Sequence, residues 1–333
     1  MRFNPILFTL TAAACIGLAP AYSQPTQAQP PGPDVIVDAF EGALGAITTT
    51  RPSHGKGYCA AGQFVATAEG TRLSVAPVFN GQPVPAIIRF GVGGPNARVA
   101  DTARTTRGLA IRMETPAGDI WDSASISVPV FGAPTPEVFV ANLAVRRLGP
   151  NGTPPDAAAV AAFVAANPAV TLQGRWLAAN TPPASFATTP YWGVNAFRFQ
   201  GADNQLRIAR WVFEPRAGVE RLTAEQLTSM PAEFLADELR RRVATAPVEF
   251  DMVLQFPAAG DDVNNPTIAW PDDRPRAVVG RLTVREVAPG PGGACDPISF
   301  LTLDQEPGIA FSDDPTLHVR ASSYAVSLSR RTR

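Results

Sequence analysis

Near the end of the sequence, an arginine and a tyrosine are spaced in a way that could hold a metal ion. Arg320 precedes Tyr324 by four residues, and residues four apart on a helix are neighbours on one face. The guanidinium would then favour the phenolate over the phenol, and phenolate is a known axial ligand of haem iron. The alternative is a half-buried tyrosine packed against an arginine stem, and this short pattern alone does not separate the two.

Acid–base chemistry has few candidates, because the sequence contains only two histidines, His54 and His318. His54 lies in the segment R-P-S-H-G-K-G at residues 51–57. A neutral imidazole opposite a metal could take a proton from bound peroxide and return it to the departing oxygen. His54 is therefore a candidate for the acid–base residue, although a histidine taken alone is more often an ordinary core or surface residue. His318, two residues before Arg320, is expected to be structural or exposed.

Composition and the N-terminal segment indicate an exported globular protein. The 333 residues are 45% hydrophobic and carry a net charge of −1, which allows a large core and argues against nucleic acid as a partner. Residues 1–21 are predicted to be a signal peptide, because a short basic start is followed by the apolar residues 6–18 and then by Ala-Pro-Ala. No other segment is apolar over a length that spans a membrane, so we expect a periplasmic or secreted protein.

The rest of the sequence reads as one short leader and one domain. Residues 22–34, rich in Gln and Pro, are expected to be a disordered leader. Residues 35–333 contain no similar linker and are expected to form one domain. Two cysteines remain in it, Cys59 and Cys295. In an oxidising compartment they could form a disulfide, or they could be two separate small buried side chains, and the sequence leaves both open.

The predicted elements are mainly strands, with helices between and after them. The strands are expected at residues 62–69, 72–78, 86–92, 108–114, 120–128, 193–199, 206–214, 249–256 and 277–287. The helices are expected at residues 136–148 and 155–166, in two portions of residues 223–245 separated by Pro231, and from about residue 313 to residue 329. Alternation of apolar and polar residues along the strands favours antiparallel pairing. We predict an α+β fold built on an antiparallel, eight-stranded β-barrel with surrounding helices.

Taken together, four segments resemble the haem catalases, in that family's order and rough spacing. They are residues 51–64, 89–112, 122–131 and 320–324. The second is the most specific, because Arg89-Phe90 and then A-D-T-A-R-T-T-R-G-L-A-I-R are similar to the family's R-F and A-D-T-x-R-D-x-R-G-F-A-x-K. The sequence is shorter than typical catalases and most resembles the small catalase-related peroxidases, so the barrel is expected to be of the catalase type.

The resemblance implies a role for each matching residue. His54 would be the acid–base residue on the distal side of a haem b. Tyr324, supported by Arg320, would be the axial ligand of the haem iron, and Phe139 would stack on the distal face of the porphyrin. The haem propionates would pair with three arginines, Arg51, Arg89 and Arg331.

Two departures from the family pattern bear on the expected activity. Gly91 stands where typical catalases have a serine that supports the distal histidine, and Ser127 stands where they have the distal asparagine. Loss of that amide should weaken the oxidation of a second peroxide more than the first O–O cleavage. The resemblance therefore implies a peroxidase with weak catalase activity at most, with Ser127 as a catalytic residue in place of the asparagine. Its substrates would be hydrogen peroxide, with organic peroxides as an option, and a small organic electron donor.

Two other functions fit the same resemblance. An enzyme similar to the allene oxide synthases would rearrange fatty acid hydroperoxides without a donor. A haem-storage or haem-sensing protein would need no acid–base residue, and the intact His54 argues against it. The sequence does not identify the donor, and it leaves open whether the protein is a monomer or a small homo-oligomer.

Overall fold

The computed structural model describes residues 29–44, 51–290, 292–300 and 307–332. The predicted signal peptide lies outside these residues, as does most of the predicted leader. Pro33 and Asp34, the last two residues of that leader, already belong to helix α1 (Pro33–Leu44). Helical structure therefore begins slightly earlier than the sequence predicts.

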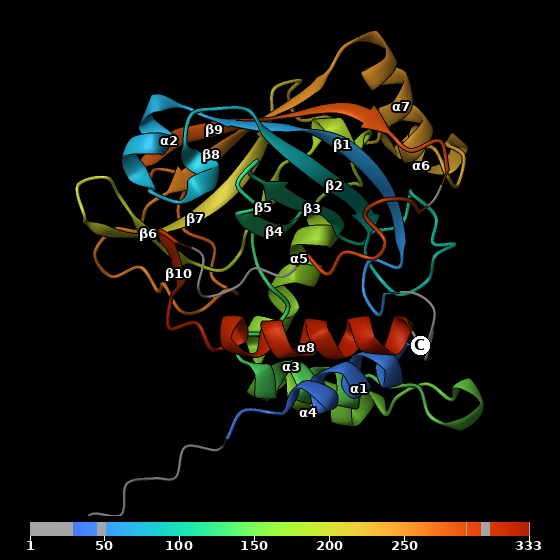
Figure 1. Cartoon of the computed structure of the whole chain (residues 1–333). Helices are drawn as coiled ribbons and strands as arrows, with labels where there is room; N and C mark the ends of the chain where they lie inside the picture. The colour runs from blue at the N-terminus through green and yellow to red at the C-terminus, as the bar shows by residue number, and fades with distance from the viewer. Residues whose placement is uncertain (1–28, 45–50, 291, 301–306, 333) are drawn as a thin grey trace, which may run out of the picture.

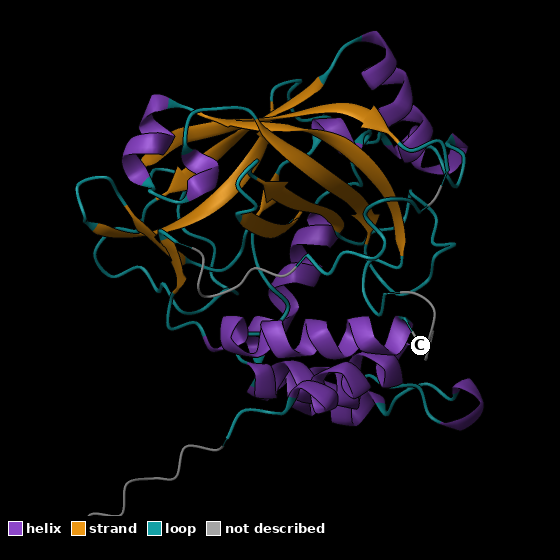
Figure 2. Cartoon of the chain, viewed as in Figure 1, coloured by secondary structure: helices purple, strands orange, loops and turns teal. Residues whose placement is uncertain are grey.

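Eight antiparallel strands close into a barrel, as predicted (Figure 1, Figure 2). These strands are β1 (Lys56–Ala66), β2 (Val84–Val92), β3 (Arg107–Glu114), β4 (Ile120–Ile126), β5 (Tyr191–Trp192), β7 (Leu206–Pro215), β8 (Val248–Gln255) and β9 (Arg276–Val287). They pair in the order β5-β4-β3-β2-β1-β9-β8, and β7 closes the ring by pairing with both β8 and β5. Two short strands, β6 (Phe197–Gln200) and β10 (Ile309–Phe311), extend the sheet from β7.

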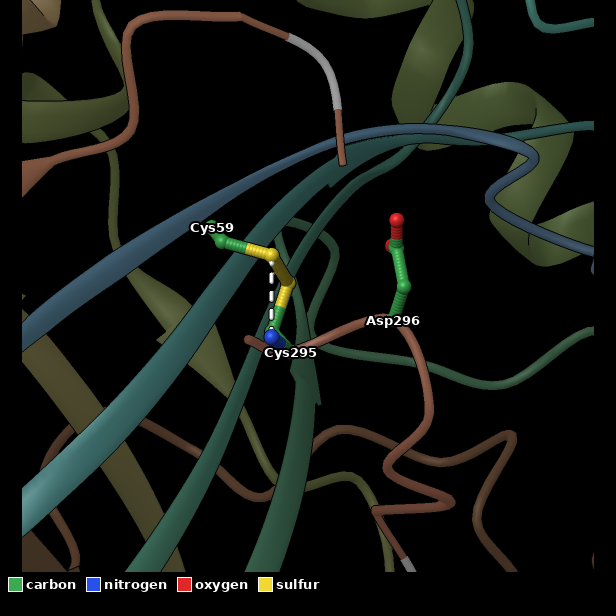
Figure 3. A group of neighbouring side chains, drawn as sticks. All are labelled: Cys59, Cys295 and Asp296. Carbon is green, nitrogen blue, oxygen red and sulfur yellow. Dashed lines mark hydrogen bonds between the residues drawn. A yellow bond between two sulfur atoms is a disulfide. The ribbon is translucent and has the colours of Figure 1, made fainter. Parts of the chain in front are cut away.

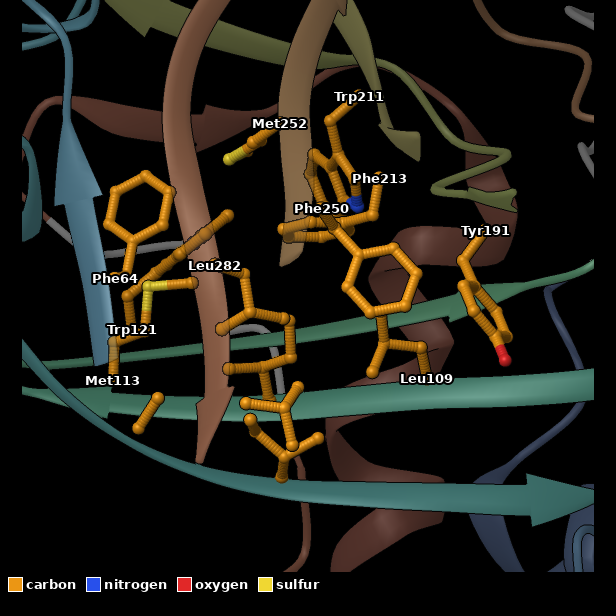
Figure 4. Close-up of a cluster of buried hydrophobic side chains, with 14 of the residues drawn as sticks. Phe64, Leu109, Met113, Trp121, Tyr191, Trp211, Phe213, Phe250, Met252 and Leu282 are labelled. Carbon is orange, nitrogen blue, oxygen red and sulfur yellow. The ribbon is translucent and has the colours of Figure 1, made fainter. Parts of the chain in front are cut away.

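Large apolar side chains fill the barrel. Leu109, Ile111 and Met113 of β3 are fully buried, and the residues between them are partly exposed, which is the alternation expected for a strand with one face toward a core. Figure 4 shows Leu109 and Met113 together with Trp121 and Trp211 in this cluster. Burial of each such side chain contributes roughly 1.5–3 kcal/mol. The barrel is thus a packed core, and a ligand must bind outside it.

The strand expected at residues 72–78 is wrong. The structure has helix α2 (Ala68–Leu73) there, followed by the 3-10 turn η1 (Pro77–Phe79). Thr67 begins α2 as its N-cap, because its hydroxyl accepts a hydrogen bond from the backbone N–H of Gly70 at 3.0 Å. This local capping interaction outweighs the strand propensity of the apolar residues that follow.

The strand expected at residues 193–199 is interrupted. β5 ends at Trp192, and the next strand, β6, begins at Phe197. A Cβ atom at Gly193 would lie 2.3 Å from the ring of Trp211, so the backbone passes closely over that indole. The break leaves Asn195 buried outside both ladders, where its side chain reaches the start of the last helix.

The predicted helical segments are confirmed. They are α3 (Pro136–Val145), α4 (Ala157–Ala166), α6 (Ala224–Ser229), α7 (Leu235–Thr245) and α8 (Pro315–Arg331). Asp314 caps α8, and its carboxylate accepts a hydrogen bond from the N–H of Thr316 at 2.9 Å. Elements that the sequence did not predict are α1, α5 (Leu172–Ala179), and the 3-10 segments η2 (Pro150–Gly152), η3 (Pro168–Thr171) and η4 (Phe186–Thr188).

Helices α1, α3, α4 and α8 form a layer next to the barrel (Figure 1). Arg330 of α8 holds α1 in this layer, because its guanidinium lies 2.7 Å from Asp38, 2.8 Å from Glu41 and 3.3 Å from Asp34. No single described helix is long and apolar enough to cross a membrane. The pair Ala157–Ala166 and Pro168–Ala179 meets that criterion only jointly, across a bend of 115°.

A disulfide joins Cys59 of β1 to Cys295 (Figure 3). The two Cα atoms are 5.4 Å apart and 236 residues apart in the sequence. Of the two possibilities that the sequence left open, the structure therefore has the bridge. It fixes the segment that contains Asp296 and Ile298 against the barrel, close to the end of α8.

Candidate active site

A pocket of about 300 Å³ lies between the barrel and the helix layer. Its walls come from β2, β3, β4 and β5, from the segment before β1, and from α1, α3 and α8. Most of the lining is apolar. Seven of the eight predicted site residues line this one pocket, although they come from distant parts of the chain. They are Arg51, His54, Arg89, Phe139, Arg320, Tyr324 and Arg331.

The eighth predicted residue, Ser127, does not line the pocket. It is buried, and its hydroxyl accepts a hydrogen bond from the backbone N–H of Arg107 at 2.8 Å. Its own N–H donates to the Arg107 carbonyl, also at 2.8 Å. Ser127 thus fastens the end of β4 to the start of β3, and Ser125 and Ile126 line the pocket in its place. The position of Ser127 gives no support to a catalytic role.

His54 has an unusual backbone conformation. Its φ angle is +53°, in the left-handed region that few residues other than glycine adopt. Glycines lie against its side chain on two sides. A Cβ atom at Gly108 would lie 2.8 Å from Nδ1, and one at Gly91 would lie 3.2 Å from the His54 Cβ and 3.1 Å from a guanidinium nitrogen of Arg89. A side chain at Gly91, where the family has a serine, would therefore fit only if its neighbours moved by a few tenths of an ångström.

The surroundings of His54 keep its imidazole neutral. Burial of the ring, together with the positive charges of Arg89 and Arg107, lowers the pKa of His54 to about 4. Nδ1 is buried and has no hydrogen-bond partner among the described residues. The backbone of Gly91 acts on the ring in the opposite direction and raises its pKa, but burial outweighs it, so at neutral pH the ring is neutral and can accept a proton.

Three arginines lie together at one end of the pocket, and the carboxylate of Asp296 is near enough to raise the pKa of each. Arg51 donates to the carbonyl of Ile298 at 2.6 Å, Arg331 donates to that of Asp296 at 3.0 Å, and Arg89 donates to that of His54 at 2.9 Å. Among the described residues, none of the three arginines forms an ion pair. Burial and the neighbouring arginines lower the pKa of Arg51 to about 9. A cluster of buried like charges of this kind calls for bound anions.

The position of Arg89 depends on a glycine. A Cβ atom at Gly57 would lie 2.1 Å from its guanidinium, so only glycine lets the side chain cross β1 at that point. Burial lowers the pKa of Arg89 to about 10 and also lowers that of Arg331. Burial of these guanidinium groups destabilises the free protein, and ion pairs with the carboxylates of a ligand would offset this loss.

On the opposite wall, α8 presents Tyr324 with its predicted partner. Nη2 of Arg320 donates to the phenol oxygen at 3.1 Å. The charge of Arg320, together with this hydrogen bond, lowers the pKa of Tyr324 in spite of its burial. The structure therefore confirms the contact that the four-residue spacing predicted.

A chain of hydrogen bonds behind Arg320 was not predicted. Nη1 of Arg320 donates to the side-chain oxygen of Asn195 at 3.0 Å. The amide of Asn195 in turn donates to Asp314 at 2.7 Å and to the hydroxyl of Thr316 at 2.8 Å. Asp314 was expected only as a helix cap, and no local pattern in the sequence marks Asn195, because the break between β5 and β6 alone brings it to α8.

Comparison with known proteins agrees with this geometry. The sequence profile of the family described as Catalase matches residues 47–332. The chain belongs to the catalase family. It is 40% identical to the catalase-related peroxidase of Synechococcus elongatus over 90% of this chain and 89% of that protein. It is 34% identical to the catalase-related peroxidase of Mycolicibacterium paratuberculosis, over 90% and 95% of the two proteins.

Solved catalase structures share the fold of this catalase-family protein. Catalase A from Saccharomyces cerevisiae aligns with a TM-score of 0.75 at 21% identity, over 85% of this chain and 61% of that one. A fungal catalase aligns with a TM-score of 0.74, over 85% and 59%. The chain thus spans about 60% of these larger proteins, and the likeness concerns the barrel and the helices around it.

The pocket fits the haem on which the catalase family depends. Phe139 has two ring neighbours, Phe131 stacked at 5.6 Å and Phe40 tilted by 56° at 4.9 Å, which together give an apolar aromatic wall. The three unpaired arginines suit two propionates, since a guanidinium binds a carboxylate with two parallel hydrogen bonds. A phenol with a lowered pKa on one wall offers a ligand for the metal of a porphyrin, and the imidazole of His54 on the other wall offers a base.

Proposed function

We propose that this protein is a haem b peroxidase that reduces hydrogen peroxide with electrons from a small organic donor. The observation that carries the proposal is the arrangement of a single pocket, with the Arg320–Tyr324 pair on one wall and a neutral His54 among the residues of the other. The names of the two relatives that are 40% and 34% identical support a peroxidase over a hydroperoxide isomerase or a haem-storage protein.

The residues of the pocket would hold the haem from three directions. Tyr324 would be the ligand for its iron, and Arg320 lowers the pKa of the phenol, which favours its ionised form. Phe139 would pack on the macrocycle. The propionates would bind to Arg51, Arg89 and Arg331. Once bound, the haem supplies the redox chemistry, because it can take up the two oxidising equivalents of a peroxide and pass them to a donor one at a time.

His54 moves the proton in this reaction. Its neutral imidazole would take a proton from one oxygen of the peroxide and return it to the other oxygen, which then departs as water. A pKa of about 4 leaves the base free over the whole neutral range. The Nδ1 atom has no hydrogen-bond partner among the described residues.

The polar groups of the pocket favour peroxidase over catalase activity. Asn195 is the only amide side chain among the described lining residues, and it is bonded to Arg320 on the Tyr324 side. Ser127 faces the backbone of Arg107. A second peroxide would thus find no amide beside His54 to orient it, so its oxidation to oxygen should be slow.

The protein is proposed to act in the periplasm or outside the cell, as a monomer or a small homo-oligomer. The Cys59–Cys295 disulfide supports an oxidising compartment, and the apolar residues 6–18 with the following Ala-Pro-Ala support export. Fractionation of cells that express the full chain, with N-terminal sequencing of the exported form, tests this. Retention of residues 1–21 on a cytoplasmic protein would contradict it.

The peroxidase proposal is tested by titrating the purified protein with haemin. One equivalent should bind and give a high-spin ferric spectrum of the phenolate type, and peroxide with a phenol should then be consumed together. Tyr324→Phe should abolish that spectrum. Tyr58→Phe is the matched control, because Tyr58 also lies by an arginine, Arg240, at 5.9 Å, but outside the pocket. Absence of haem binding by the unmodified protein would refute the assignment of the pocket.

A further inference from the structure

Two partly exposed tryptophans in contact connect the pocket to the surface of the molecule. Trp192 of β5 lines the pocket. Its indole meets the indole of Trp176 edge to face, with ring centroids 6.1 Å apart. Trp176 belongs to α5, does not line the pocket, and is itself partly exposed. Because indoles are among the most easily oxidised side chains, such a pair can carry an electron between its two ends.

The other tryptophans do not make this connection. Trp121 and Trp211 also meet edge to face, with centroids 5.5 Å apart, but they are only 1% and 2% exposed and lie in the barrel core (Figure 4). Trp211 reaches a pocket residue through the hydroxyl of Ser125 at 2.9 Å, yet nothing leads from it to solvent through an indole. Trp270 is buried beside Arg210 and does not line the pocket.

The surroundings of Trp176 are positively charged. The guanidinium of Arg221 lies over its ring, 5.0 Å from the centroid. Arg104 donates to the carbonyls at the end of α5 at 3.2–3.3 Å, and the exposed Arg175 is the neighbouring residue in the chain. None of the three arginines forms an ion pair with a described carboxylate, so they attract an anionic molecule to this surface.

We propose that Trp176 is a surface oxidation site for anionic aromatic donors, connected to the pocket through Trp192. The inference rests on the proposed peroxidase function and extends it to donors too large to enter the pocket. An electron passes from Trp176 through Trp192 to the pocket, and the donor then restores the electron to Trp176. For each hydrogen peroxide, two donor molecules each lose one electron and become radicals, and two protons, from phenolic donors themselves or from solvent for donors such as ABTS, complete two water molecules.

The test compares two donors on the haem-loaded full chain. The sulfonated dye ABTS is large and anionic, and phenol is small and neutral. Trp176→Phe should lower kcat/KM for ABTS by at least about tenfold and should leave that for phenol within about twofold. Trp270→Phe is the matched control, because Trp270 also has an arginine over its ring, and it should change neither rate.

A second readout does not depend on turnover. Peroxide added without a donor should produce an indole radical in the electron paramagnetic resonance spectrum, and the peptide containing Trp176 should gain oxygen in mass spectra. Trp192→Phe should remove both signals from Trp176. Unchanged ABTS oxidation in Trp176→Phe, or oxidation confined to other residues, would overturn the inference while phenol turnover still supports the peroxidase. If the unmodified protein oxidises neither donor, the peroxidase proposal fails, and this inference fails with it.

Discussion

The Tyr324 wall and the His54 wall of the pocket are built in opposite ways. On the first, a regular helix and a chain of hydrogen bonds from Asp314 through Asn195 and Arg320 hold the phenol in one place. On the second, His54 has a positive φ angle, and its Nδ1 has no partner among the described residues. A metal ligand needs a fixed position, whereas a base needs a free nitrogen. The difference therefore follows from the two tasks, and of the two walls it is the His54 wall that has a strained backbone.

Removal of the imidazole should have the largest effect on the rate of reaction with peroxide. It should also distinguish the role of the His54 wall from that of the Tyr324 wall. We expect His54→Ala to lower kcat/KM for peroxide by about 10²–10⁴-fold, because proton transfer loses its base, while haem affinity stays close to normal. Stopped-flow reaction with peroxide and a haemin titration measure the two quantities. His318→Ala is the control, because its ring contacts the Ser312 carbonyl at 3.0 Å outside the pocket, and it should react normally. A normal rate in His54→Ala would show that His54 is not the base that reacts with peroxide.

The two walls also differ in how far the sequence predicts them. The Arg320–Tyr324 contact follows from helix periodicity, and the predicted cap at Asp314 follows from Asp-Pro at the start of a helix. Asn195 could not be predicted, because it reaches α8 only through the irregular backbone between β5 and β6. Ser127 was predicted as catalytic from its place in a motif, and no sequence pattern shows that its hydroxyl faces Arg107.

The fold itself was more predictable than its details. Alternation along strands such as β3 indicated the antiparallel barrel, because one face of each strand must be apolar. Part of helix α2 was predicted as a strand, because the N-cap hydrogen bond of Thr67 favours a helix more strongly than the apolar residues after it favour a strand. α1 was missed because its position depends on distant contacts, of which Arg330 with Glu41 is one.

The pH dependence should report the state of His54. Because its pKa is lowered to about 4 from an ordinary 6.5, the rate constant for peroxide should stay level down to about pH 5 and fall about tenfold per unit below pH 4. Between pH 6.5 and 4 the unfolded chain binds a proton there that the folded chain does not. The contribution of His54 to the free energy of unfolding should therefore be fully present above pH 6.5. It should decrease by on the order of 3 kcal/mol as the pH falls toward 4.

Chemical denaturation at several pH values, compared between the unmodified protein and His54→Gln, isolates this contribution. The variant should lose the part of the pH dependence that lies between pH 4 and 6.5. Equal pH dependence in both proteins would show that the ring is not kept neutral by its surroundings, and that the contrast between the walls is weaker than the geometry indicates.

A smaller effect is expected from the hydrogen-bond chain behind the tyrosine. In Asn195→Leu, Arg320 loses its acceptor and can move away from Tyr324, so the pKa of the phenol should rise. Ultraviolet titration of the haem-free protein measures that rise, and haem affinity should fall by about tenfold. Asn142→Leu is the matched control, because Asn142 also accepts from an arginine, at 2.9 Å, on the surface of α3. An unchanged pKa of Tyr324 would show that Arg320 lowers it without the support of Asn195.

The smallest effect on activity is expected from restoring the family's amide at the position that the motif suggests. Ser127→Asn should not raise oxygen release from peroxide, because the side chain faces the backbone of Arg107 and does not line the pocket. The larger side chain should instead destabilise the fold by about 1–3 kcal/mol. Oxygen evolution and thermal unfolding measure the two outcomes, with Ser125→Asn as the comparison because Ser125 does line the pocket. If Ser127→Asn released oxygen rapidly, residue 127 would face the peroxide, and weak catalase activity would follow from the missing amide alone.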